Sequence, residues 1–91
     1  MVQDAVTGAQ AGLRGVFATE LVSRLPRLIA WHEGACLAAE DVEAAVRDAH
    51  TLATSAFLVG EPELSRLARG AENGDADMLA ELVEKLQVWT P

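Results

Sequence analysis

The feature that most constrains the fold is an apolar stripe at helical spacing in the middle of the chain. Its members recur every three or four residues, the period of one face of an α-helix: they are Val42, Ala45, Val46, Ala49, Leu52, Ala53, Ala56 and Phe57. Glu40-Asp41 opens this helix, with Asp41 as the expected N-cap. Gly60, followed by Pro62, indicates that the helix ends there and that another begins.

Similar patterns flank this central helix. Residues 1–12 are small and polar, and we expect a loose arm or a frayed helical turn. Residues 13–25 carry Val16, Phe17, Leu21, Val22 and Leu25 at helical spacing. Pro26 removes a backbone hydrogen bond, so it is expected to begin a separate second helix. The inward residues predicted for that helix are Leu28, Ile29, Trp31 and, beyond Gly34, Leu37.

Two more helices are expected after the central one. The first covers about residues 62–71, and the second follows the turn Asn73-Gly74-Asp75, is capped by Asp75 and reaches about Trp89. Their predicted inward residues are Leu64, Leu67, Ala68, Met78, Leu79, Leu82, Val83, Leu86 and Trp89. Short connections make successive helices antiparallel. The predicted fold is therefore all-α, an up-down antiparallel four-helix bundle with a short N-terminal helix, formed by residues 13–91 as one domain.

Charge and composition limit the classes of partner that the chain is expected to bind. Fourteen acidic and seven basic residues give a net charge of −7, which repels nucleic-acid phosphates and anionic lipids, so neither nucleic acid nor membrane is expected as a partner. Neither a signal peptide nor an apolar run of about 20 residues is evident. With Cys36 as the single cysteine, no internal disulfide can form, and a cytoplasmic location is expected.

One histidine stands out beside the central stripe. His50 lies roughly 80–100° from the centre of the stripe, at the edge of the predicted core. Arg47 and Thr54 are one turn away on the same flank. An imidazole that is both exposed and supported by a helix can act as a nucleophile or carry a phosphoryl group.

From His50 to Glu72 the chain resembles the histidine-containing phosphotransfer (HPt) domain of bacterial phosphorelays. The matching positions are His50, Leu52, Ser55, Gly60, Leu64, Leu67 and Glu72. The segment from Leu21 to Leu28, with Pro26 inside it, is also similar to the N-terminal half of the family. At two positions the chain departs from the family pattern, because Ala53 and Thr54 stand where the family has lysine and glycine.

The resemblance implies a phosphocarrier with no kinase or phosphatase activity of its own. His50 would accept the phosphoryl group, and Glu72 would orient its imidazole. The implied partners are a response-regulator receiver domain, a histidine kinase or both. Mg²⁺ would belong to the receiver, so this chain would need no cofactor or metal. Phe57, Leu58 and Gly60 are expected to contribute to the docking surface.

The positive charge that the family lysine would supply must come from elsewhere. We expect Arg47, Arg69 or both to replace it, since guanidinium groups bind phosphate well. Thr54 could hydrogen-bond a phosphate oxygen or obstruct the approach of a partner.

Two other functions fit the same fold. One is a phosphorylation-incompetent adaptor that binds receiver or kinase domains as a regulatory module, which the missing lysine and glycine favour. The other is a structural or dimerisation bundle. A metal site at His32 and Cys36 and a hydrolase built on Ser55 are both disfavoured, because neither has the further partners that such a site needs.

Overall fold

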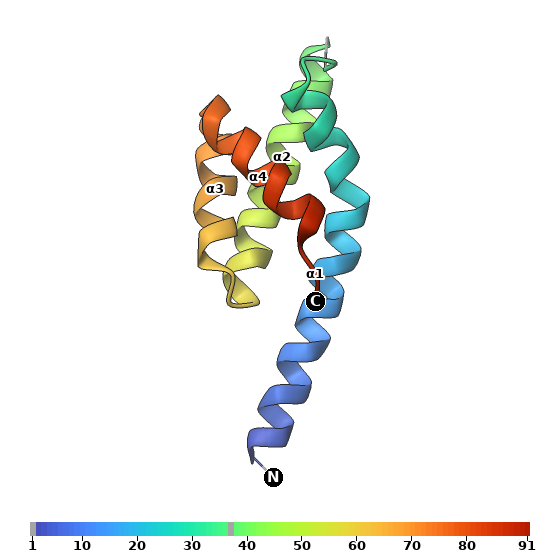
Figure 1. Ribbon diagram of the computed structural model, residues 1–91. Helices are drawn as coiled ribbons and strands as arrows, with labels where there is room; N and C mark the ends of the chain where they lie inside the picture. The colour runs from blue at the N-terminus through green and yellow to red at the C-terminus, as the bar shows by residue number, and fades with distance from the viewer. Residues whose placement is uncertain (1, 37) are drawn as a thin grey trace.

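The computed structural model describes residues 2–36 and 38–91, with side chains from residue 12 onward. These residues form α1 (Val2–His32), α2 (Ala39–Leu58), α3 (Pro62–Glu72) and α4 (Ala76–Val88), and no strand. Each helix packs on two others, α1 on α2, α2 on α3, α3 on α4 and α4 back on α1, with α4 crossing obliquely (Figure 1). The predicted all-α antiparallel bundle is confirmed.

The predicted break at Pro26 is wrong, because α1 runs through it without interruption and the described residues contain no separate short N-terminal helix. A proline inside a helix costs about 3 kcal/mol, and contacts on both sides of it offset this cost. Leu21 and Leu28 are buried in the core, while Arg24 and Arg27 both bind Asp48 of α2. Tertiary packing therefore overrides the local preference.

The ends of α1 also differ from the prediction. The helix begins at Val2, so the expected loose arm is helical from its second residue, and it extends past the rest of the bundle (Figure 1). At the other end α1 stops at His32, and Leu37, which was expected to face inward, lies outside the described residues.

The turns on either side of α3 follow their sequence signals. The Gly60 amide donates to the Phe57 carbonyl at 3.2 Å and the Glu61 amide donates to the Ala56 carbonyl at 2.9 Å, a Schellman motif that needs the left-handed φ of +80° at Gly60. The expected Asp75 cap is confirmed, since its carboxylate accepts from the Met78 amide at 3.0 Å. The Asp41 cap is wrong, because α2 begins at Ala39 and its N-cap is Ala38.

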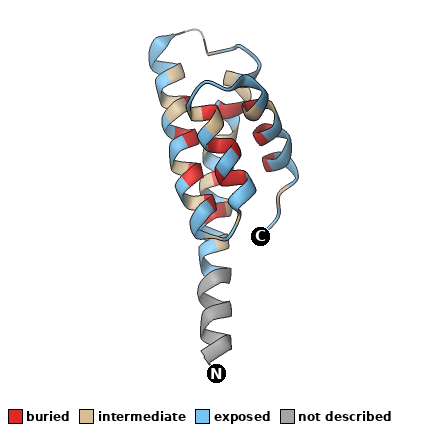
Figure 2. Ribbon diagram, turned by 90° about the vertical axis from the view of Figure 1, so that its left-hand side faces the viewer, coloured by how far each residue is buried: buried red, intermediate tan, exposed pale blue. Residues whose placement is uncertain are grey.

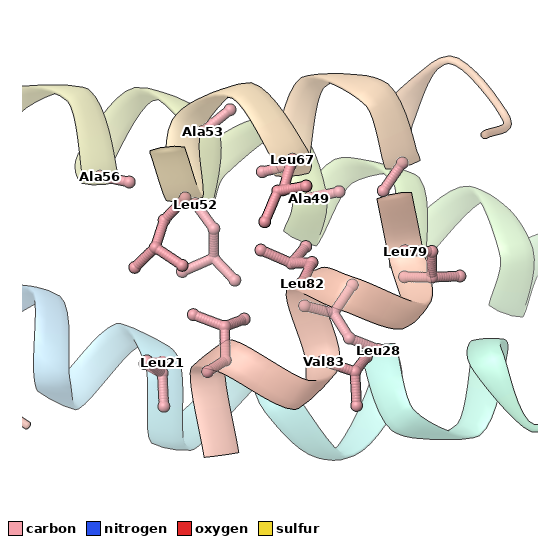
Figure 3. Close-up of a cluster of buried hydrophobic side chains, with 14 of the residues drawn as sticks. Leu21, Leu28, Ala49, Leu52, Ala53, Ala56, Leu67, Leu79, Leu82 and Val83 are labelled. Carbon is pink, nitrogen blue, oxygen red and sulfur yellow. The ribbon is translucent and has the colours of Figure 1, made fainter. Parts of the chain in front are cut away.

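The core lies where the four helices face one another (Figures 2 and 3). Leucines from all four helices fill it, and α2 contributes mainly alanines, which allow α3 to approach closely. Three residues predicted to face inward are exposed instead: Val16 by 59%, Val22 by 72% and Phe57 by 64%. Each is the immediate neighbour of a buried residue, so a rotation of about 100° carries it out of the interface.

Candidate functional site

His50 and Glu72 meet at the surface between α2 and α3. The tight turn at Gly60 makes these helices antiparallel, which brings the middle of α2 opposite the end of α3. His50 Nδ1 lies 2.8 Å from Glu72 Oε1, with side chains that are 63% and 27% exposed, respectively. The structure thus brings together the two residues that the sequence singled out.

The contact selects a tautomer of the imidazole. An ionised carboxylate can only accept a hydrogen bond, so Nδ1 carries the proton and donates it to Glu72. In the neutral imidazole Nε2 then has a free lone pair, and this nitrogen has no hydrogen-bond partner among the described residues. An exposed nitrogen lone pair on a ring held at its other nitrogen is suited to attack an electrophile that a partner presents.

Ala53 and Thr54 differ in their surroundings. Ala53 is 1% exposed, and the Ser65 hydroxyl of α3 donates to its carbonyl at 2.7 Å, so this position belongs to the α2–α3 interface. Thr54 is exposed, and its hydroxyl donates to the His50 carbonyl at 3.4 Å.

Arg47 and Arg69 border the site without touching the imidazole. Arg47 stands one turn before His50 on α2, and Arg69 stands one turn before Glu72 on α3. Both side chains are exposed, and neither forms a hydrogen bond or ion pair within the described part of the chain. Two exposed arginines on different helices therefore stand one turn from the two members of the His50–Glu72 pair, and neither has a partner among the described residues.

The predicted docking residues follow His50 along α2. Phe57 and Leu58 are 64% and 65% exposed, and they lie about two turns beyond His50. Gly60 forms the turn into α3. Apolar side chains this exposed, next to a reactive group, are a surface that a partner protein can cover.

An ion-pair cluster around the buried carboxylate of Asp48 secures α2 against α1, and sequence analysis missed it. Asp48, only 3% exposed, accepts from Arg24 at 2.7 Å and from Arg27 at 3.0 Å. The signal was present, because Asp48 falls on the apolar stripe, three residues after Ala45 and four before Leu52. A carboxylate at a buried helix position requires a cation.

A second missed cluster fixes the turn that contains Gly60. Arg14 donates to the Val59 carbonyl at 3.2 Å and to Glu61 at 2.9 Å, and its guanidinium lies 5.1 Å from the centre of the Trp89 ring. The Trp89 indole also donates to Glu61 at 3.2 Å. The start of the bundle in α1 and the residue after α4 are thus joined at the α2–α3 turn.

The structure adds no evidence for a hydrolase built on Ser55 or for a metal site at His32 and Cys36. The Ser55 hydroxyl donates to Glu20 at 2.8 Å, a contact that supplies no histidine base. In the described part of the chain, no group of three or more His, Cys, Asp or Glu side chains is placed to hold a metal ion. No described helix combines the length and apolarity required to cross a membrane.

Comparison with known families gives one match. Residues 12–89, which include α2, α3, α4 and most of α1, match the family model described as the Hpt domain. Comparison with curated proteins and with solved structures finds no match.

Proposed function

The chain belongs to the Hpt domain family, and we propose that it carries a phosphoryl group on His50 in a cytoplasmic two-component phosphorelay. Domains of this family serve histidine phosphotransfer in two-component signalling. The observation that carries the proposal for this chain is the contact of 2.8 Å between His50 Nδ1 and Glu72 Oε1.

The transfer begins with a receiver domain that carries an aspartyl phosphate. The Nε2 lone pair of His50 attacks phosphorus, the acyl-phosphate P–O bond breaks, and the receiver aspartate leaves as a carboxylate. The imidazole gains positive charge while Nδ1 keeps its proton, and the Glu72 carboxylate stabilises that charge. Mg²⁺ belongs to the receiver, and a histidine kinase is an alternative donor.

The phosphoryl group on Nε2 needs compensating charge. We assign this role to Arg47 and Arg69, which stand one turn before His50 on α2 and one turn before Glu72 on α3. If they share the role, each single alanine variant slows phosphoryl uptake a few-fold and the double variant slows it more. Uptake by the double variant at the wild-type rate would refute this assignment.

Docking would use the apolar residues beyond His50. Phe57 and Leu58 are exposed on the same outer face of α2, so a receiver that covers them places its aspartate near the imidazole. Phe57→Glu should weaken receiver binding at least tenfold, since a charge would enter the buried centre of the interface. Val88→Glu on α4 is the matched control, because Val88 is also exposed but lies on another helix.

The test of the proposal is incubation with phosphorylated receiver domains of the source organism, followed by detection of acid-labile phosphate on this chain. Wild-type protein and His32→Gln should both acquire the label, whereas His50→Gln should not. His32 is the matched control, because it is the other histidine of the chain and is also exposed. Label that persists in His50→Gln would refute the role of His50.

A second function is favoured by a specific observation. Ala53 is buried at the position where the family has lysine, so the chain lacks that charge beside His50. A phosphorylation-incompetent adaptor would keep the docking face and bind receiver or kinase domains without turnover. Receiver binding with no acid-labile label on any variant would support this adaptor over the carrier.

A further inference from the structure

A groove of about 210 Å³ lies between α1 and α2, next to the proposed docking face. Its rim is apolar and consists of Leu13 and Val16 of α1 and Leu58 of α2, which are 46%, 59% and 65% exposed. Glu20 and Ser55 add the polar groups of its lining. A cavity of about 150 Å³ can hold a benzene molecule, so this groove has room for one large side chain.

The carboxylate of Glu20 is only partly satisfied. Its Oε2 accepts the hydrogen bond from the Ser55 hydroxyl at 2.8 Å, and Oε1 has no hydrogen-bond or ion-pair partner among the described residues. Two arginines on the same helix are engaged elsewhere, Arg14 with Glu61 and Arg24 with Asp48. The groove therefore contains one carboxylate for which the described chain supplies no cation.

We propose that this groove selects partners by accepting a lysine or arginine side chain from the docked receiver domain. The inference rests on the proposed function for its partner, and on Glu20 for its chemistry. The aliphatic stem of the incoming side chain would pack on Leu13, Val16 and Leu58, and its cationic head would reach Glu20 Oε1. Long basic side chains commonly bury their stems in this way while the charge stays near water.

Charge decides between this occupant and others. A purely aliphatic side chain would cover the Glu20 carboxylate without pairing it, which carries a desolvation cost. An acidic side chain would be repelled by Glu20 and by the net charge of −7. A basic side chain avoids both penalties, so the groove discriminates among receivers that could all cover the apolar rim.

The first arm of the test uses every receiver domain that labels His50. Glu20→Gln keeps a carbonyl that accepts from Ser55 and removes only the charge. We expect it to raise the Kd about tenfold and to reduce the dependence of binding on salt. Glu84→Gln, which removes an exposed carboxylate from α4, is the matched control and should leave the Kd unchanged. Equal Kd values for wild type and Glu20→Gln would overturn the proposal.

The second arm needs no receiver and separates this proposal from the proposed function. The ¹H–¹⁵N NMR spectrum of the domain is titrated with n-butylguanidinium, which mimics an arginine side chain, and with n-butanol as the neutral probe. The cation should shift the Ser55 and Leu58 amides in wild type but not in Glu20→Gln. If no receiver labels His50, the proposed function fails, but this titration still shows whether the groove accepts a basic side chain. Equal shifts by both probes, or none by the cation, would overturn the inference.

Discussion

The ion-pair cluster between α1 and α2 leads to a quantitative prediction about stability. Asp48 is 3% exposed and binds two arginines, so either arginine alone can keep its charge paired. The Arg27 side chain is half exposed, and its Nη1 lies 3.0 Å from Asp48 Oδ2. Its replacement by alanine should lower the free energy of unfolding by about 0.5–1 kcal/mol. The Arg24 side chain is 32% exposed, and its Nη1 lies 2.7 Å from Asp48 Oδ1. Its replacement by alanine should lower the free energy of unfolding by about 1–2 kcal/mol.

Removal of both arginines should cost more than the sum of the two single changes. The double variant leaves the buried Asp48 carboxylate without a cation, and breaking a buried pair in this way costs about 3–5 kcal/mol. Part of the loss is recovered, because the buried Nε of Arg24 has no hydrogen-bond partner among the described residues of the wild-type protein. We expect the double variant to exceed the sum of the single changes by about 1 kcal/mol.

Urea unfolding followed by circular dichroism measures these free energies. Arg66→Ala is the control: Arg66 pairs with Glu63 on the surface, where its hydrogen bond lowers the pKa of the Glu63 carboxyl. That variant should unfold at the wild-type midpoint. Additive costs for Arg24 and Arg27, or a larger cost for Arg27 than for Arg24, would refute the idea that one buried carboxylate is shared between them.

Three further predictions concern the site and the core. Glu72→Gln should slow phosphoryl uptake by His50 about tenfold, since a neutral acceptor stabilises the charged ring less; a rate equal to wild type in a stopped-flow transfer assay would contradict this. Gly70→Ala should cost about 1–3 kcal/mol, because the added Cβ would clash with the Met78 side chain, and adding Met78→Ala should recover part of that loss in thermal unfolding. Leu67→Ala, at a position with 0% exposure, should cost about 2–5 kcal/mol, and a change below 1 kcal/mol in urea unfolding would show that the core collapses around it.

Local sequence signals predicted most of the fold. Gly60, Pro62, the Asn73-Gly74 turn and the Asp75 cap act within a few residues, and the structure agrees with all of them. Pro26 has an equally strong local preference, but residues far away in the sequence decide its outcome. Arg24 and Arg27, on either side of Pro26, bind Asp48, and Leu21 and Leu28 pack in the core. A rule based on neighbouring residues alone does not include the free energy of these contacts.

Only part of the site could be predicted from the sequence, because the rest depends on contacts between residues that are far apart in the chain. The resemblance to the Hpt family paired His50 with Glu72, and their contact depends only on the α2–α3 hairpin. The pairing of Glu20 with Ser55 was missed, because it depends on the register between α1 and α2, which the sequence pattern does not specify. The burial of Ala53 agrees with its place on the predicted apolar stripe, but the hydrogen bond from Ser65 to its carbonyl was missed, since periodicity gives a face but not the closeness of the neighbouring helix.

We propose that His50 carries the phosphoryl group on Nε2 while Glu72 holds Nδ1. The most direct measurement is a long-range ¹H–¹⁵N NMR spectrum of the histidine side chains, with ³¹P coupling, after phosphorylation by a receiver. We expect phosphorus coupled to Nε2 of His50, an Nδ1 that stays protonated, and an unchanged His32. Phosphorus on Nδ1, or a His50 ring unchanged while a bound receiver loses its phosphate, would contradict it.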